Sequence, residues 1–291
     1  MYNKNITKTW RYKMSCLTRI LNYYESLTPS EQKIADFINN NPELVVKFTI
    51  HKLASAIGCA PSSITKFVRK LDYASFSAMR IELAKSVDSV SAQDFSEILS
   101  WGNSRDHLSQ IYIKNISGIC SDTLEINEFD KFLEVARLVT QAQNVYLFGV
   151  GTSAVIAQDL QHKLIKLKKH CMYSLDGNFG LQNASLATEK DVAFAISHSG
   201  QTDEVNLAAQ KIKEAKCPLV ALTRYSKTPL AAMADINLYV PNTEPVNRVT
   251  SIFSRYAFLF LVDIVFLNVM QLIGEEPEKV LHNYRGLHNI P

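Results

Sequence analysis

The sequence has few of the residues that disulfide-stabilised or metal-stabilised folds require. Its 291 residues include five widely spaced cysteines and no Cys-x-x-Cys pair; these are Cys16, Cys59, Cys120, Cys171 and Cys217. The odd number and wide spacing favour reduced, buried thiols and predict neither a disulfide framework nor a zinc site. We expect no metal and no cofactor. The chain also has no internal repeat and no low-complexity tract, so no repeat architecture is expected.

The sequence also offers little that would direct the chain to a membrane. Residues 1–14 are polar and basic without an apolar core, so we expect no signal peptide. The apolar stretch Tyr256–Ile273 is long enough for a membrane span, but Asp263, Asn268 and Gln271 place polar groups on it. We therefore predict a buried or dimer-interface helix, a cytoplasmic protein and no membrane partner.

Positive charge is concentrated in the first third of the chain. Residues 1–90 carry 13 Lys and Arg against 7 Asp and Glu, whereas residues 91–291 carry 18 against 21. The length is sufficient for two domains, and 47% hydrophobic with 20% charged residues is typical of a soluble globular protein. A small basic domain joined to a larger, mildly acidic one predicts a nucleic-acid contact in the N-terminal part.

Short helices are predicted over residues 15–87. Thr28-Pro29-Ser30-Glu31 is typical of a helix start, and Asn39 to Pro42 ends that helix. Thr49 then precedes a helix over Ile50–Ile57, Gly58 ends it, and Pro61 begins a helix over Pro61–Leu71. Two short helices joined by a glycine-containing turn indicate a helix-turn-helix. Its inward residues are Leu53, Ala54, Ile57, Ile64, Phe67, Val68 and Leu71.

The outward residues of the second helix are polar near its start and basic further on. They are Ser62, Ser63, Thr65, Lys66, Arg69 and Lys70. This order fits base-edge and phosphate contacts with operator DNA. The alternative is a solvated helix face, but the turn and the basic domain favour DNA binding.

The predicted domains are a helix-turn-helix domain over 1–87, a linker over 88–106 and a second domain over 107–291. The linker has no hydrophobic periodicity and is richer in Ser, Asp, Gln and Gly than the segment before it. Two amphipathic helices, Leu108–Ile126 and Phe129–Thr140, follow it.

Strands and helices then alternate along the second domain. The predicted strands are Val145–Phe148, Cys171–Leu175, Val192–Ile196, Leu219–Leu222 and Ile236–Val240. The predicted helices are Ser153–Leu167, a stretch around Gly180–Ala187, Asp203–Ala215, Pro229–Met233 and Ser251–Ile273. Short apolar strands separated by helices predict a five-stranded, doubly wound parallel sheet of the α/β class.

Two loops rich in glycine and hydroxyls follow strands of this sheet. They are Gly149-Val150-Gly151-Thr152-Ser153 and Ser197-His198-Ser199-Gly200-Gln201-Thr202. Short hydroxyl donors, glycine and helix N-termini suit a phosphate group, so we predict a phosphorylated small molecule. Ordinary capped turns would explain one loop more easily than both. The first loop also fits a loose dinucleotide pattern with Asp176 after the next strand, but that fold does not require the second loop.

With these motifs, the second half resembles a SIS (sugar isomerase) domain and residues 15–275 resemble RpiR-type bacterial transcription regulators. The resemblance implies a DNA-binding domain fused to a sugar-phosphate sensor, with Ser153, Ser197, Ser199 and Thr202 taking the phosphate. The expected effector site comprises Gly151, Thr152, Ser153, Ser197, His198, Ser199, Gly200, Thr202 and Glu204. The chain departs from the family at Lys66, where Arg is common, and at Leu71-Asp72-Tyr73, where Leu-Gly-Phe is common.

Enzymatic catalysis is the alternative function, because SIS folds also include sugar-phosphate isomerases and lyases. Such chemistry needs a base, for which His198, Glu204, His162 and Asp176 are candidates. Fusion to a DNA-binding unit explains the chain without turnover, so we predict a regulator of carbohydrate metabolism and no enzyme. A single helix-turn-helix makes few contacts, so a homodimer or higher homo-oligomer is expected, with residues 108–140 and 251–273 as its interface.

Overall fold

The computed structural model describes residues 16–87, 105–241 and 252–274. Two compact units make up the chain, one within Met1–Ile126 and Pro241–Phe253 and the other within Asn127–Val240 and Ser254–Pro291. Residues 88–104 of the linker predicted over 88–106 lie outside the described residues, and its last two residues are the start of a helix. The predicted helix start at Ser251 also lies outside the described residues. The three predicted domain boundaries stay predictions.

The first unit is helical. Its elements are α1 (Cys16–Tyr23), the 3-10 turn η1 (Tyr24–Ser26), α2 (Pro29–Asn40), α3 (Pro42–Lys47), α4 (Ile50–Ile57), α5 (Pro61–Lys70), α6 (Phe76–Val87) and α8 (Arg105–Ile126). α2 begins as predicted: the Glu31 amide donates to Thr28 Oγ1 at 3.4 Å, and the Thr28 amide donates to Glu31 Oε2 at 2.9 Å. This reciprocal pair satisfies two amides at the helix start.

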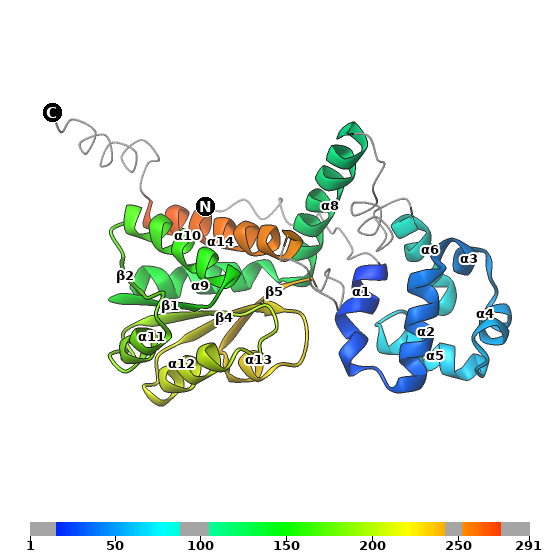
Figure 1. The fold of residues 1–291 in the computed structure, drawn as a ribbon, viewed down its shortest axis with the longest axis horizontal. Helices are drawn as coiled ribbons and strands as arrows, with labels where there is room; N and C mark the ends of the chain where they lie inside the picture. The colour runs from blue at the N-terminus through cyan, green and yellow to red at the C-terminus, as the bar shows by residue number, and fades with distance from the viewer. Residues whose placement is uncertain (1–15, 88–104, 242–251, 275–291) are drawn as a thin grey trace, which may run out of the picture. The chain divides into compact units, whose positions relative to one another are not determined.

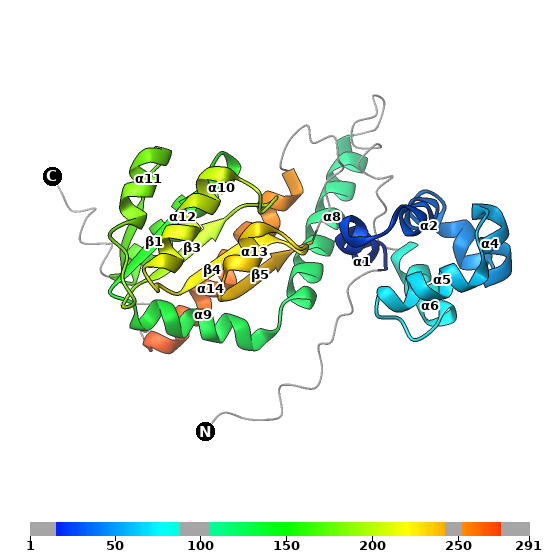
Figure 2. The same ribbon diagram turned by 90° about the horizontal axis from the view of Figure 1, so that it is seen from below.

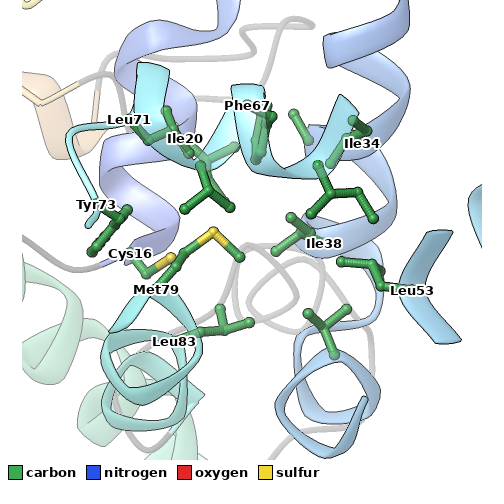
Figure 3. Packing of buried hydrophobic residues seen from close by; sticks show 14 of the residues in the cluster. Cys16, Ile20, Ile34, Ile38, Leu53, Phe67, Leu71, Tyr73, Met79 and Leu83 are labelled. Carbon is green, nitrogen blue, oxygen red and sulfur yellow. The ribbon is translucent and has the colours of Figure 1, made fainter. Parts of the chain in front are cut away.

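A single apolar cluster holds α1 to α6 together (Figure 3). Ile34 and Ile38 of α2 and Leu53 of α4 are fully buried in it. Phe67 of α5 and Met79 of α6 fill the same interior. α5 is therefore held in place by its inward side, whereas Ile57 of α4, which was also predicted to lie inward, is only half-buried.

The second unit contains the predicted five-stranded parallel sheet. Its strands are β1 (Asn144–Gly149), β2 (His170–Tyr173), β3 (Val192–Ile196), β4 (Leu219–Arg224) and β5 (Ile236–Val240). Their order is β2-β1-β3-β4-β5, and every neighbouring pair is parallel. β3 is buried along its whole length, which explains its uniformly apolar sequence.

Helices cover both faces of the sheet (Figure 1). They are α9 (Phe129–Gln141), α10 (Thr152–Lys166), α11 (Gly177–Ala184), α12 (Asp203–Glu214), α13 (Pro229–Met233) and α14 (Ile252–Ile273). α10 and α14 lie on one face, where Lys163 pairs with Asp263 at 2.9 Å, and α11, α12 and α13 lie on the other.

Among the helices that the structure describes, α14 alone has the length and apolar composition of a membrane span. Its buried residues recur on one side, from Ala257 and Leu261 through Val265 to Val269. Asp263 lies exposed between them. One side of α14 is thus core, as expected for a helix that packs on a sheet.

Candidate functional site

The predicted helix-turn-helix is formed by α4, α5 and the turn between them. Thr49 Oγ1 accepts the Lys52 amide at 3.2 Å and caps α4. Gly58 ends α4 in the left-handed conformation at φ 77°, which glycine adopts without a steric penalty. Pro61 then begins α5. The glycine turn thus ends one helix and directs the chain into the next.

The outward side of α5 forms a stripe of four exposed residues, Ser62, Thr65, Lys66 and Arg69, which we call the α5 stripe. Their spacing places them on one side of the helix. Ile64, Phe67 and Val68 are buried on the other side. Ser63 is half-buried at the edge of the stripe. An exposed polar stripe on the second helix of this motif is suited to the major groove of DNA.

Lys70 differs from the other predicted DNA contacts because its ammonium group is bound within the protein. It donates to the Ser26 carbonyl at 2.8 Å and to Glu31 Oε2 at 2.7 Å. Although desolvation opposes it, the hydrogen bonds from Lys70 and Thr28 lower the pKa of the Glu31 carboxyl. Lys70 thereby joins the end of α5 to the start of α2, which sequence periodicity could not reveal.

The end of α5 explains the departure from the family pattern at Asp72. This residue has a φ of 61°, in the left-handed region where glycine is favoured. The Asp72 amide donates to the Arg69 carbonyl and the Tyr73 amide to the Val68 carbonyl, at 3.0 and 3.1 Å, which closes the helix in a Schellman motif. The Tyr23 hydroxyl donates to Asp72 Oδ2 at 2.8 Å. α1 therefore supports Asp72, at the position where the resemblance predicts glycine.

The two loops predicted to bind phosphate lie side by side at the carboxyl ends of the parallel strands. β1 and β3 are parallel neighbours with Gly149 beside Ile196, so the loops after them begin at the same level. From β1 the chain continues to β2 on one side, whereas from β3 it continues to β4 and β5 on the other side. The carboxyl ends of β1 and β3 are therefore the switch point of the sheet. Ligands of open α/β sheets bind at such a point.

Close neighbouring atoms or a positive φ explain the glycines of both loops. A Cβ atom at Gly149 would lie 2.7 Å from the Ser153 carbonyl oxygen, so a side chain would displace the start of α10. At Gly200, where φ is 63°, a Cβ would lie 2.3 Å from Thr228 Oγ1 at the start of α13. Gly151 has a φ of 60° directly before α10. The loops are therefore tightly fixed turns.

The hydroxyls of the second loop form a small network. Ser197 is almost fully buried, and its Oγ is hydrogen-bonded to Thr202 Oγ1 at 2.9 Å and accepts the Gly200 amide at 3.1 Å. Ser199 is half-buried, and its Oγ accepts the Gln201 amide at 3.2 Å. Ser197 thus lies beneath the loop, with Ser199 and Thr202 nearer to the surface.

The helices that follow these loops begin without a side-chain cap. Thr28, Thr49 and Thr228 each accept a backbone amide at the start of their own helices. By contrast, Thr202 makes no such bond at the start of α12, because its hydroxyl is turned toward Ser197. Gly151 provides no side chain at the start of α10. No side chain therefore occupies the amides at the start of either helix, where an anionic ligand can bind. In α10 the Ser153 and Ala154 amides donate to the Val150 and Gly151 carbonyls at 3.2 and 3.1 Å, which leaves the Thr152 amide ahead of them.

His198 and Glu204 are not brought together. The His198 ring packs edge-on against Phe258 of α14, with ring centres 6.1 Å apart. Because side chains alternate along the extended chain, His198 faces α14 whereas Ser197 faces α12. Glu204 is exposed in the first turn of α12 and lines a small hollow of about 30 Å³ beside Gly149.

The remaining candidate bases lie away from the loops or have structural partners. His162 is exposed on α10, about 15 Å along the helix axis from Thr152. Asp176 Oδ1 accepts the Phe179 amide at 3.1 Å at the start of α11. Within the described parts of the chain, no three His, Cys, Asp or Glu side chains are grouped to hold a metal ion. Burial raises the pKa of the Cys16, Cys171 and Cys217 thiols to about 12, which favours the protonated thiol.

Comparison with known proteins assigns both halves of the chain. Residues 14–90 match the helix-turn-helix domain of the rpiR family, and residues 138–268 match the SIS domain. An HTH-type transcriptional regulator of Caldanaerobacter subterraneus is 32% identical over 89% of this chain and 91% of its own. One from Haemophilus influenzae is 30% identical over the same shares of the two chains.

Solved structures show the same fold. The NanR protein of Vibrio vulnificus, complexed with ManNAc-6P, has a TM-score of 0.60 at 23% identity, over 95% of this chain and 99% of its own. The sugar isomerase domain of an RpiR transcription factor from Sphaerobacter thermophilus has a TM-score of 0.55 at 22% identity, over 63% of this chain and 99% of its own.

Proposed function

The chain belongs to the rpiR family of helix-turn-helix transcriptional regulators, and we propose that a sugar phosphate bound beside β1 and β3 controls its binding to operator DNA. The α5 stripe contacts the DNA, with Ser62, Ser63 and Thr65 at base edges and Lys66 and Arg69 at phosphates. Lys70 serves chiefly to hold α5 against α2. The regulated genes belong to carbohydrate metabolism.

The observation that carries the sensor half of the proposal is the pair of uncapped helices at the switch point. α10 and α12 both begin beside loops whose hydroxyls and amides converge on one edge of the sheet. A phosphate dianion accepts charge-assisted hydrogen bonds from such groups. Ser153, Ser199 and Thr202 supply hydroxyls, and Gly151 and Thr152 supply backbone amides. Ser197 supports the loop from beneath by accepting the Gly200 amide, so Gly200 shapes the loop.

The sugar itself lies above the loops. The hollow beside Gly149 and Glu204, at about 30 Å³, is too small for a hexose. NanR, which shares the fold, is complexed with ManNAc-6P, a phosphorylated amino sugar. We therefore assign phosphorylated sugars and amino sugars as the ligand class, with Glu204 beside the sugar and His198 supporting the loop against α14.

We also propose that the chain does not isomerise its ligand. His162 is distant from the loops, and the Asp176 carboxylate is engaged at the start of α11. Of the four candidate bases, Glu204 is the carboxylate that remains beside the loops, and a lone exposed carboxylate is more often a hydrogen-bonding group than a general base. Incubation with sugar phosphates and analysis of the products separates the two functions, because turnover would indicate an isomerase.

Assembly as a cytoplasmic homodimer completes the proposal. Two helix-turn-helix units reading a two-fold operator supply the contacts that one unit lacks. The outward side of α14 exposes Leu267 and Leu272, which suits a subunit interface. Light scattering at micromolar concentration tests this, and a monomer would contradict it.

A thermal-shift screen tests the ligand class directly. A sugar phosphate at one hundred times its Kd stabilises the folded protein by about 2.7 kcal/mol. The matching unphosphorylated sugars are the control, since the loops are proposed to bind the phosphate. Equal shifts with and without the phosphate would contradict the assignment.

A further inference from the structure

A hollow in the helix-turn-helix unit lies beside the α5 stripe. Its volume is about 530 Å³, and it is formed where the start of α4, one side of α5 and the start of α6 meet. Figure 2 shows α4, α5 and α6 grouped in this unit. Thr65 and Arg69 belong to both the stripe and the hollow, whereas Ser77 and Arg80 come from α6. We call this feature the α6 hollow.

The charges around the α6 hollow favour an anion. Arg69 and Arg80 line it, and none of the described lining residues is acidic. Among the carboxylates of this unit whose side chains the structure describes, none pairs with either arginine, in contrast to Glu31, which pairs with Lys70. Two guanidinium groups at one hollow repel each other, and an anion bound between them would relieve that repulsion.

Arg80 is held in position for such an anion. It is half-buried, and its Nη1 donates to the Phe48 carbonyl at the end of α3 at 2.9 Å. A guanidinium carries five N–H donors in a planar fork that matches phosphate oxygens, and this bond uses one of them. Because the side chain is already restrained, less conformational entropy is lost when it binds a ligand.

We propose that the α6 hollow binds a phosphodiester of the DNA backbone beside the base pairs that the α5 stripe contacts, with Arg80 and Ser77 as donors. This inference rests on the proposed function. The shared residues Thr65 and Arg69 make the hollow continuous with the stripe, so a duplex lying on α5 brings its backbone to it. A backbone contact adds affinity at every sequence and does not select among sequences.

Ser77→Asp is the sharpest test. Ser77 is exposed and is the second residue of α6, where an acidic side chain favours the helix. The variant should therefore keep or raise its thermal stability. Because a carboxylate in the hollow repels a phosphate, binding to a fluorescent duplex of random sequence should weaken about tenfold. The slope of log K against log salt should fall by about 1.

Ser30→Asp is the matched control, because Ser30 is also exposed and is the second residue of α2, outside the hollow. It makes the same charge change and should bind the duplex almost as the wild type does. A second pair, Arg80→Lys and Arg80→Gln, keeps or removes the charge, and only Arg80→Gln should reduce the salt slope.

The outcomes separate the two proposals. If the wild type fails to bind duplex DNA at low salt, the proposed function is contradicted, and the hollow with it. If the wild type binds and Lys66→Ala weakens it, while Ser77→Asp and Ser30→Asp bind equally well, only the α6 hollow is overturned. Selective weakening by Ser77→Asp with an unchanged melting temperature supports the backbone contact.

Discussion

At the scale of residues, the proposed sugar-phosphate site depends on individual hydroxyls of the two loops. Ser199 and Ser153 lie near the surface on different loops, and neither fills the core. Each charge-assisted hydrogen bond contributes about 1.5–3 kcal/mol, so Ser199→Ala or Ser153→Ala should weaken the sugar phosphate about tenfold or more. Ser199→Glu should abolish binding by repelling the dianion. Calorimetry with the cognate sugar phosphate measures both effects.

The control is Ser185→Ala, at the end of α11, where the hydroxyl donates only to the Leu181 carbonyl within the described contacts. This variant should bind like the wild type. Wild-type affinity in both loop variants would mean that the ligand lies elsewhere and that the loops are only turns.

The cations of α5 should divide into two groups. Lys66 and Arg69 are exposed, so Lys66→Ala and Arg69→Ala should weaken DNA at all sequences, reduce the salt dependence and leave the melting temperature unchanged. Lys70→Ala should instead lower the melting temperature, because it removes the bonds to Ser26 and Glu31. Anisotropy titrations and thermal unfolding on the same preparations give the comparison. An unaltered Kd for a Lys66/Arg69 double variant would refute the assignment of α5.

Residue types and their spacing predicted the α5 stripe but not the role of Lys70. The helical period identifies which residues point outward, and four of the six predicted contacts are exposed. It carries no information about which outward residue meets a distant carboxylate. Likewise, the sequence placed His198 with the loop hydroxyls, whereas strand alternation turns its ring toward Phe258.

At the scale of elements, the end of α5 depends on the left-handed residue Asp72. Asp72→Gly and Asp72→Ala both lose the bond from Tyr23, but only glycine removes the steric cost of a side chain at φ 61°. The alanine variant should therefore be less stable than the glycine variant by about 1–2 kcal/mol. Urea denaturation of the full chain measures the difference. A more stable alanine variant would be incompatible with this conformation.

Asp191, directly before β3, joins the amino-terminal ends of β1 and β3. This buried carboxylate accepts from the amide and side chain of Asn144 and from the amide and hydroxyl of Thr188, at 2.7–3.0 Å. Burial opposes the charge, but these hydrogen bonds together lower the pKa of the Asp191 carboxyl below its ordinary value. The contribution to stability is therefore complete above the unfolded pKa and is lost as the pH falls through the lower folded pKa.

Asp191→Asn should destabilise the fold by about 2–3 kcal/mol at neutral pH. It should also flatten the loss of stability below about pH 4. Stability curves against pH for both proteins provide the measurement, and parallel curves would contradict this role.

Most elements were predictable because each has a local signal. β3, β5 and α13 have the predicted bounds, and the other strands differ by one to two residues at their ends. The capping box at α2 and the glycine after α4 are such signals. The α6 hollow was not predictable, since it is formed by three helices whose contacts depend on the core and not on any local pattern.

At the scale of the whole molecule, the family joins a DNA-binding unit to a SIS domain. The two units have separate cores, one around Phe67 and the other around the sheet. A ligand can change DNA affinity only as far as it binds the two functional states unequally. The coupling must therefore be measured on the full chain.

The most direct test is the DNA affinity of the full chain with and without the sugar phosphate that shifts its melting temperature. The account predicts that saturating ligand changes the Kd for operator DNA by about fivefold or more, as expected for a coupling free energy of at least about 1 kcal/mol. It also predicts that Ser199→Glu abolishes this change while the DNA affinity without ligand is retained. An identical Kd in the presence and absence of bound ligand would contradict the central claim.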